Sequence, residues 1–227
     1  MSGQLTIIGT PIGHFGDCSP RVLEALKNSD TILAEDTRRT MVLLNHFQLG
    51  KKELISFSQQ KERTKSAMII EKLKSGEQVA LVSDAGMPCV SDPGSYLVEA
   101  CYAHEIDVDV IPGPSAFVLA YAASGFGGSF IFEGFLGRDK KLRRYLRTLI
   151  GEKRNVIFYE SPFRLNKCLT DIFNILGDRE IFIAREMTKL HQEFYRGKCS
   201  QALMKFKDEV KGELTVIIRG DVNNGEV

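Results

Sequence analysis

The alternation of short apolar runs with helical patterns along the whole chain constrains its fold more than any other feature. Apolar runs that predict strands lie near residues 4–9, 30–35, 53–57, 78–82 and 107–111, with helical patterns near 19–28, 37–46, 59–75 and 95–104. Such alternation is typical of an α/β protein with largely parallel sheets. Ser19 and Pro20 are expected to open the first helix as its N-cap and first helical residue.

The same pattern starts again after Pro112-Gly113-Pro114. It predicts strands near 129–133, 154–160, 179–186, 192–197 and 213–219, and helices near 115–124, 140–150, 163–176 and 200–209. Ser161-Pro162 is expected to cap and start the helix at 163–176, whose buried stripe is Leu165, Cys168, Leu169, Ile172, Phe173 and Leu176. We therefore expect two similar α/β domains, residues 1–112 and 113–227, with a disordered end at 223–227.

Composition excludes several classes of protein. The chain has 227 residues, of which 43% are hydrophobic, enough to bury a sizeable core. It contains neither an apolar stretch of the roughly 18 to 20 residues that a membrane span needs nor a signal-peptide pattern, so we expect a cytoplasmic protein without a membrane partner. The five cysteines form no CxxC and the four histidines no HxxxH, so we expect neither disulfides nor a metal site.

Three loops rich in glycine and proline each follow a predicted strand: Gly9–Gly16, Ser83–Gly94 and Pro112–Ala116. Ligands of open α/β sheets bind beyond the carboxyl ends of the strands, which is where these loops fall. Pro11 interrupts a dinucleotide-binding glycine pattern, although Glu35 lies near the expected distance, and no P-loop motif is present. The alternatives are a long structural connection for the second loop and an interdomain linker for the third.

Positive charge is concentrated in one segment, although the net charge of the chain is only +1. Residues 138–154 hold eight Lys or Arg and two Asp or Glu, a local charge of +6. If Leu142, Tyr145, Leu146, Leu149 and Ile150 form the buried stripe of a helix, the basic side chains face solvent. A face of a single sign favours contact with RNA phosphates over a merely solvated surface. The predicted RNA-binding residues are Arg138, Lys140, Lys141, Arg143, Arg144 and Arg147.

Six short motifs connect the chain to a known family: GTPIG at 9–13, AEDTR at 34–38, SDAGMPCVSDPG at 83–94, PGPSA at 112–116, FYESPFR at 158–164 and AREMTK at 184–189. Taken together and in this order, they resemble the tetrapyrrole-methylase superfamily. AEDTR and the 83–94 motif narrow the resemblance to the branch that methylates the 2′-hydroxyl of small-subunit ribosomal RNA. The resemblance extends over residues 5–220.

The resemblance implies two α/β/α domains with S-adenosylmethionine in the cleft between them. Family positions carried onto this chain give the cofactor-binding residues Pro11, Ile12, Asp84, Met87, Val90, Ser115, Ala116, Tyr159 and Glu160. The implied reaction is 2′-O-methylation of a cytidine ribose in 16S rRNA of the small ribosomal subunit. A homodimer is also implied.

Methylation of a ribose hydroxyl invites a general base, because the hydroxyl is a weak nucleophile until it loses its proton. The candidate bases in the matched motifs are Glu35, Asp36, Glu160 and Glu186, with Arg38 and Arg185 as partners for carboxylates or for substrate phosphate. Arg185-Glu186 is alternatively a structural ion pair at a strand end. Glu35-Asp36 is alternatively an acidic pair that caps a helix.

Some features depart from the pattern of the rRNA branch: His14, Met87 and Gly137-Arg138 replace its usual residues. The chain also ends at Val227, without the short helical domain that many relatives carry. These departures concern the substrate more than the cofactor. Two alternatives therefore stay open, a methyltransferase of this fold that acts on a tetrapyrrole or another small molecule, and an RNA-binding module without catalysis.

Overall fold

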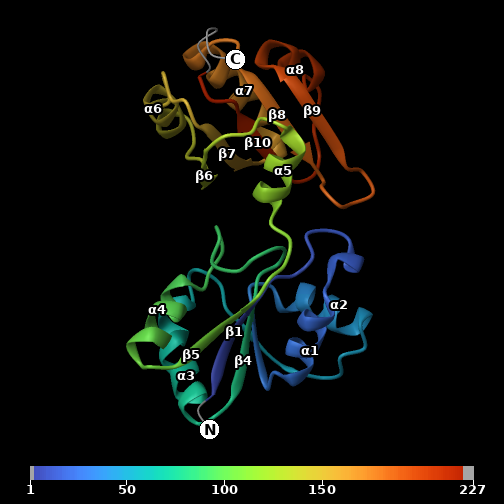
Figure 1. Cartoon of the computed structure of the whole chain (residues 1–227), viewed down its shortest axis with the longest axis vertical. Helices are drawn as coiled ribbons and strands as arrows, with labels where there is room; N and C mark the ends of the chain where they lie inside the picture. Colours follow the sequence, from blue (N-terminus) through green and yellow to red (C-terminus); the bar gives the residue numbers. More distant parts are fainter. Residues whose placement is uncertain (1–2, 222–227) are drawn as a thin grey trace. The chain divides into compact units, whose positions relative to one another are not determined.

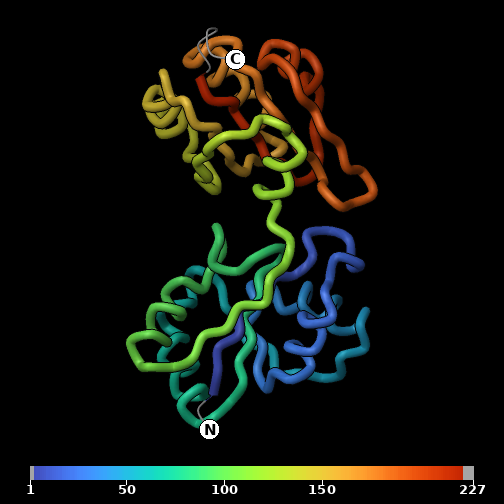
Figure 2. The backbone as a smooth tube through the Cα atoms, viewed as in Figure 1, coloured from blue at the N-terminus to red at the C-terminus, as the bar shows by residue number. Residues whose placement is uncertain are grey.

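The chain folds into two compact units, Met1–Ser115 and Ala116–Val227. The structure is a computed structural model in which residues 3–221 are described, so the prediction for residues 223–227 falls outside the described residues. Figure 2 traces the backbone, which passes once from the first unit to the second. No helix within residues 3–221 is long and apolar enough to cross a membrane.

The first unit contains a parallel sheet, as the alternating pattern predicts. Its strands are β1 (Gln4–Ile8), β2 (Thr31–Ala34), β3 (Glu53–Ser56), β4 (Gln78–Val82) and β5 (Asp107–Ile111), in the order β3-β2-β4-β1-β5. Its helices are η1 (Phe15–Asp17), α1 (Pro20–Asn28), α2 (Thr37–His46), α3 (Glu62–Lys74) and α4 (Ser95–Ala103). All adjacent strands run parallel.

Helices cover both faces of this sheet (Figure 1). Val22 and Leu26 of α1 pack with Leu43 and Leu44 of α2 on one face. On the other face, α3 and α4 bury a second apolar cluster that includes Leu97. Because both faces are covered, the central strands β1, β2 and β4 are mostly apolar.

The predicted start of α1 is confirmed. Pro20 is the first helical residue, and the Ser19 hydroxyl accepts a hydrogen bond from the backbone N–H of Val22 over 3.3 Å. This side-chain cap satisfies one of the N–H groups that a helix leaves unpaired at its first turn.

The second unit is also an α/β structure, with strands β6 (Phe130–Phe135), β7 (Asn155–Glu160), β8 (Glu180–Arg185), β9 (Glu193–Lys198) and β10 (Leu214–Ile218). Its helices are α5 (Ala116–Ser124), α6 (Lys140–Thr148), η2 (Pro162–Arg164), α7 (Leu165–Leu176) and α8 (Cys199–Lys205). The strand order is β6-β7-β10-β8-β9.

This second sheet is mixed, so the prediction of largely parallel sheets and of two similar halves is wrong here. β6 pairs with β7 in parallel, whereas β10 runs antiparallel to both β7 and β8, and β9 runs antiparallel to β8. The cause is the connection at residues 186–192, which is too short to carry a crossover helix, so β9 returns antiparallel to β8. β10 follows β9 through α8 and takes its direction.

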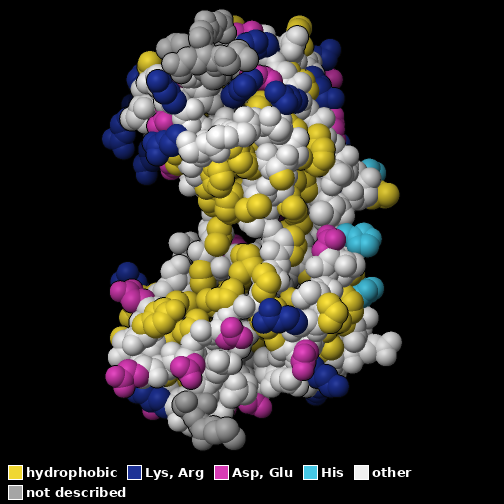
Figure 3. All heavy atoms as spheres, viewed as in Figure 1, with side chains coloured by type: hydrophobic (Ala, Val, Ile, Leu, Met, Phe, Trp, Pro, Cys, Tyr) yellow, Lys and Arg dark blue, Asp and Glu magenta, His cyan; other side chains and the backbone are white. Residues whose placement is uncertain are grey.

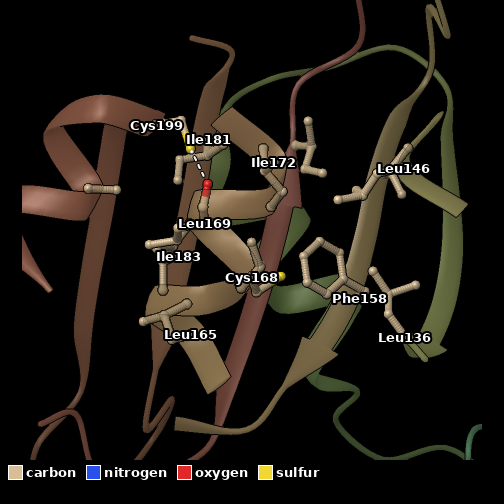
Figure 4. Packing of buried hydrophobic residues seen from close by; sticks show 14 of the residues in the cluster. Leu136, Leu146, Phe158, Leu165, Cys168, Leu169, Ile172, Ile181, Ile183 and Cys199 are labelled. Atoms are coloured by element: carbon tan, nitrogen blue, oxygen red, sulfur yellow. Dashed lines mark hydrogen bonds between the residues drawn. The ribbon is translucent and has the colours of Figure 1, made fainter. Parts of the chain in front are cut away.

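The core of the second unit lies between this sheet and the helices α6, α7 and α8 (Figure 4). Phe158 of β7 and Cys168 of α7 point toward each other in it, and Cys199 Sγ donates a weak hydrogen bond to the Leu169 carbonyl over 3.4 Å. Helix α5 packs on the opposite face of the sheet, against β10, β7 and β8.

Three sequence predictions about α7 and α6 need correction. Ser161 and Pro162 begin the short helix η2, and α7 starts only at Leu165, without a side-chain cap. Phe173 is 39% exposed and not part of the buried stripe. Ile150 is 66% exposed, because α6 ends at Thr148 and Ile150 lies beyond the helical repeat.

Candidate functional site

At the carboxyl ends of the neighbouring strands β1 and β4, the chain continues to helices on opposite faces of the sheet. β1 leads to α1 on one face, while its neighbour β4 leads to α4 on the other. The two connections therefore diverge and leave room beyond the strand ends, the place where open α/β sheets bind ligands. Two of the predicted site loops, 9–16 and 83–94, begin there.

Backbone contacts join these two loops. Thr10 and Gly86 exchange two backbone hydrogen bonds of 2.9 and 3.0 Å, and the buried Thr10 hydroxyl donates to the Ser83 carbonyl over 3.3 Å. Ile12 lies beside them, since a Cβ on Gly86 would meet its Cγ2 at 3.5 Å and the Pro114 carbonyl at 3.4 Å. The loops after β1, β4 and β5 thus converge within the first unit.

The third loop approaches the first at Gly9 and Gly113. A Cβ on Gly9 would lie 2.5 Å from the Gly113 nitrogen and 2.5 Å from the Met87 sulfur, so no larger residue fits without a shift. The Gly113 N–H points to the Met87 sulfur over 3.3 Å. Of the predicted cofactor residues, Ile12, Met87 and the segment leading to Ser115 are therefore brought together, with Pro11 and Val90 half-buried in the same loops.

Carboxylates gather at the adjacent ends of β2 and β4. Asp84 Oδ1 accepts a hydrogen bond from the Asp36 backbone N–H over 2.9 Å, and its Oδ2 lies 3.5 Å from Arg39 Nε. Asp84 thus ties the loop after β4 to the loop after β2. Asp84 was predicted to bind a ligand directly, and these contacts show that its carboxylate also has a structural role.

Asp36 caps α2, which is the structural alternative raised for the acidic pair. Its carboxylate accepts from the Arg38 backbone N–H over 2.9 Å and from the Arg38 guanidinium over 2.9 and 2.6 Å. The Arg38 hydrogen bonds lower the pKa of Asp36 to about 2. Asp36 is therefore a poor proton acceptor at neutral pH, and Arg38 is engaged with it.

Glu35 and Asp92 differ from Asp36, because burial disfavours their charged forms. Burial, and then the charge of Asp84, raise the pKa of Glu35, while Arg39 opposes the shift. Burial and the charge of Glu35 raise the pKa of Asp92 to about 6, against a hydrogen bond from Ser83. Sequence reasoning missed Asp92. Its only signal was a second aspartate in the 83–94 loop.

Glu62 is a second residue of this region that sequence reasoning missed. Its side chain is buried, and Oε1 accepts hydrogen bonds from the backbone N–H groups of Gly94, Tyr96 and Leu97 over 2.9, 2.9 and 3.4 Å. A carboxylate from α3 thus closes the 83–94 loop onto the start of α4. In the sequence Glu62 is one acidic residue among many on a helix, so no pattern singled it out.

Ala116, Tyr159 and Glu160 belong to the second unit. Ala116 begins α5, and Tyr159 lies near the end of β7, with its ring centroid 5.1 Å from that of Phe132. Glu160 is only 3% exposed, forms an ion pair with Arg164 at 2.5 Å and accepts from the Ser161 N–H over 2.6 Å. A carboxylate held in this way stabilises the turn into η2, and its burial and its two partners leave it poorly placed to accept a proton from a substrate hydroxyl.

Arg185 and Glu186, at the end of β8, each form an ion pair with another residue, Arg185 with Glu193 and Glu186 with Lys189. Arg185 donates to Glu193 over 3.0 Å and to the Lys211 carbonyl over 3.2 Å. Glu186 accepts from the Glu213 N–H over 2.8 Å and from Lys189 over 3.0 Å. Burial would raise the pKa of Glu186, but these two donors outweigh it and lower that pKa.

The basic helix α6 has the predicted amphipathic form. Leu142 and Leu146 are buried in the core, and the exposed basic residues of α6 and of the turn just before it are Arg138, Lys140, Lys141, Arg144 and Arg147. Arg143 departs from the prediction of a free basic face, because it lies 3.7 Å from the largely buried Asp171. Within residues 3–221, no group of three or more His, Cys, Asp or Glu side chains is arranged to hold a metal ion.

Comparisons with known proteins agree with this geometry. The family model of the tetrapyrrole (corrin/porphyrin) methylases matches residues 4–203. A relative from Thermotoga maritima named ribosomal RNA small subunit methyltransferase I is 56% identical over 220 residues, which covers 96% of this chain and 99% of that protein.

Solved structures show the same fold. The methyltransferase CobJ matches with a TM-score of 0.71 and 23% identity, covering 96% of this chain and 95% of its own. A uroporphyrin-III C-methyltransferase from Thermus thermophilus, complexed with S-adenyl homocysteine, matches with a TM-score of 0.66 and 18% identity, covering 95% of this chain and 97% of its own. The chain therefore belongs to the tetrapyrrole (corrin/porphyrin) methylase family, and within it to the ribosomal RNA small subunit methyltransferases I.

Proposed function

We propose that this protein uses S-adenosylmethionine to methylate the 2′-hydroxyl of a cytidine in 16S rRNA of the small ribosomal subunit. The observation that carries the proposal is the 56% identity to a ribosomal RNA small subunit methyltransferase I over nearly the whole of both chains. The motifs AEDTR at 34–38 and SDAGMPCVSDPG at 83–94 support the cytidine as target. The loops that contain them lie at the ends of β2 and β4.

The first unit offers a fitting place for the cofactor. The backbones of the loops after β1 and β5 touch at Gly9 and Gly113, where a Cβ on either glycine would clash with the backbone of the other. This contact, which only glycine permits, holds the two loops together at the carboxyl ends of the strands. S-adenosylmethionine, when bound, supplies a methyl group on a sulfonium. Pro11, Ile12, Asp84, Met87, Val90 and Ser115 would hold it, and Ala116, Tyr159 and Glu160 of the second unit stay predictions.

Among the predicted bases, Glu35 fits proton transfer best. A general base works best with a pKa near the operating pH, and burial together with Asp84 raises the pKa of Glu35. Asp36 is held ionised by Arg38, whereas Glu160 and Glu186 are committed to Arg164 and Lys189. We propose that Glu35 accepts the proton of the ribose hydroxyl.

The exposed basic residues of α6, together with Arg138 just before it, are proposed to bind RNA phosphates. Arg138, Lys140, Lys141, Arg144 and Arg147 present one sign of charge to solvent. Each phosphate they neutralise would release counterions, so binding should weaken steeply as salt rises. Arg143 is assigned to Asp171 instead. We further propose that the protein works in the cytoplasm, and that it forms the homodimer that the family resemblance implies.

The experiment that tests the function is transfer of a radiolabelled methyl group from S-adenosylmethionine to small ribosomal subunits from cells that lack this modification. The proposal predicts label in 16S rRNA at a linkage that resists alkaline hydrolysis, because a methylated 2′-oxygen no longer attacks its phosphate. Label on added tetrapyrroles alone would contradict it and favour the small-molecule alternative. RNA binding without transfer, and without heat on titration with S-adenosylmethionine, would favour a binding module.

A further inference from the structure

Aromatic side chains line one face of β6, the edge strand of the second sheet. Phe130 is 40% exposed, Phe132 is half-buried and Phe135 is 64% exposed. Soluble proteins rarely leave such a row uncovered, because exposed apolar side chains on an edge strand invite unwanted association unless they serve binding.

A β-bulge places Phe135 on this face. Phe132 pairs with Ile157, but Phe135 pairs with Tyr159, so β6 contains one residue more than β7 between these two pairs. Gly134 supplies the extra residue with a φ of +61°, a left-handed conformation that favours glycine. Without the bulge, strand alternation would direct Phe135 to the opposite face, where Ile131 packs against the core.

Neighbouring rings pack against this aromatic face. Phe117 of α5 stacks on Phe132, with ring centroids 4.1 Å apart and planes inclined by 16°. Tyr159 touches Phe132 and Phe135, with centroid distances of 5.1 and 5.4 Å. A flat ring that is already fixed loses little entropy when a further ring stacks on it.

The start of the basic helix α6 follows directly. Arg138 is three residues beyond Phe135, so the two Cα atoms are at most about 11 Å apart. Lys140 and Lys141 come next, and all three are exposed. Figure 3 shows Lys and Arg side chains gathered over α6, beside the hydrophobic side chains gathered over β6 and α5. Aromatic rings beside fixed positive charge are the two components of single-strand nucleic-acid binding.

We propose that the exposed ring of Phe135 stacks an unpaired base of the RNA substrate, while Arg138, Lys140 and Lys141 bind the phosphates beside it. The inference rests on the proposed function, because it assigns this surface to the substrate of the same enzyme. The second unit would then bind single-stranded RNA, since a base inside a duplex has no free face on which a ring can stack.

The test is the binding of a fluorescein-labelled oligocytidylate of about eight nucleotides, a length within the site sizes of single-strand binders, followed by fluorescence anisotropy. Phe135→Ala should lower the affinity roughly 5- to 150-fold, the equivalent of the 1–3 kcal/mol that base–aromatic stacking contributes. The salt dependence of this variant's affinity should equal that of the wild type, because the substitution removes no charge. Arg138→Gln combined with Lys140→Gln should instead flatten the salt dependence.

Three further variants separate stacking from simpler explanations. Phe135→Leu keeps an apolar side chain but lacks a π face, so it should lose affinity as Phe135→Ala does, whereas Phe135→Tyr should retain it. Phe194→Ala is the matched control, because Phe194 is 46% exposed on β9, the opposite edge of the same sheet. It should bind the oligonucleotide like the wild type.

Unchanged affinity in Phe135→Ala, or an equal loss in Phe194→Ala, would overturn the proposal. A change in sedimentation with unchanged RNA affinity would also overturn it, because the aromatic face would then be an interface between copies of the chain. Failure of the proposed function would give a different result, which is the absence of methyl transfer to small subunits by the wild type. Normal transfer together with full binding by Phe135→Ala would reject the stacking alone.

Discussion

Replacing Asp92 with asparagine should stabilise the protein at neutral pH and have little effect near pH 4. Burial and the charge of Glu35 raise the pKa of Asp92 from its ordinary value of 3.8 to about 6. The folded state therefore holds a proton that the unfolded chain has already released between about pH 4 and pH 6, and stability falls as the pH rises through this interval. Asparagine does not ionise, so the variant does not lose stability as the pH rises.

The size of the effect follows from the two pKa values. A difference of about 2 corresponds to about 3 kcal/mol at 1.36 kcal/mol per pH unit, which is an upper limit for the half-buried Asp92 carboxyl. Solvent screening at a partly exposed side chain reduces it to about 1 kcal/mol. In a chain of this length, about 1 kcal/mol raises the Tm by about 2–4 °C.

The assay is thermal unfolding of wild type and Asp92→Asn, followed by circular dichroism at several pH values from about 4 to 8. Asp36→Asn is the control with the opposite sign, because the Arg38 hydrogen bonds hold the pKa of Asp36 at about 2, below its ordinary value. The stability that Asp36 contributes is present above about pH 4 and is lost as the pH falls toward 2, so Asp36→Asn should be less stable than the wild type at neutral pH. A Tm difference for Asp92→Asn that does not grow with pH would show that Asp92 does not hold its proton more tightly in the folded state.

Three other substitutions test the packing around the site and in the core. Gly9→Ala would place a methyl group 2.5 Å from the Gly113 nitrogen and should weaken S-adenosylmethionine binding at least tenfold by calorimetry while the protein stays folded; unchanged affinity would exclude this contact from the cofactor site. Glu62→Ala removes the acceptor of three backbone N–H groups at the start of α4 and should lower stability by about 1–2 kcal/mol in urea unfolding, with the Glu62→Gln variant losing less. Leu146→Ala empties a fully buried position in the second core and should cost about 2–5 kcal/mol in the same assay, which a fall below 1 kcal/mol would contradict.

The sequence predicted the positions of the helices and strands closely, because apolar periodicity reports which side of an element is buried. It did not predict the direction of β9 and β10, since a strand has the same apolar pattern whichever way it runs. The connection at residues 186–192 carried the missing information. It has no helical pattern and is too short for a parallel crossover.

The site was predicted in outline but not in its internal contacts. Loops that follow parallel strands must meet at one edge of a sheet, so the convergence of the Gly9–Gly16 and Ser83–Gly94 loops was accessible from the sequence. Which carboxylates are tied to basic partners was not, because pairs such as Glu186 with Lys189 depend on the fold. The raised pKa of Asp92 likewise comes from burial, which the sequence does not reveal.

Methylation of a cytidine ribose in small-subunit RNA is the proposed activity of this chain. The most direct measurement is mass spectrometry of nucleosides from 16S rRNA after incubation of unmodified small subunits with the protein and deuterated S-adenosylmethionine. We expect one labelled nucleoside, 2′-O-methylcytidine, which appears in proportion to added protein and is strongly reduced with Gly9→Ala. Label on a nucleobase, or no labelled nucleoside while the cofactor binds normally, would contradict it.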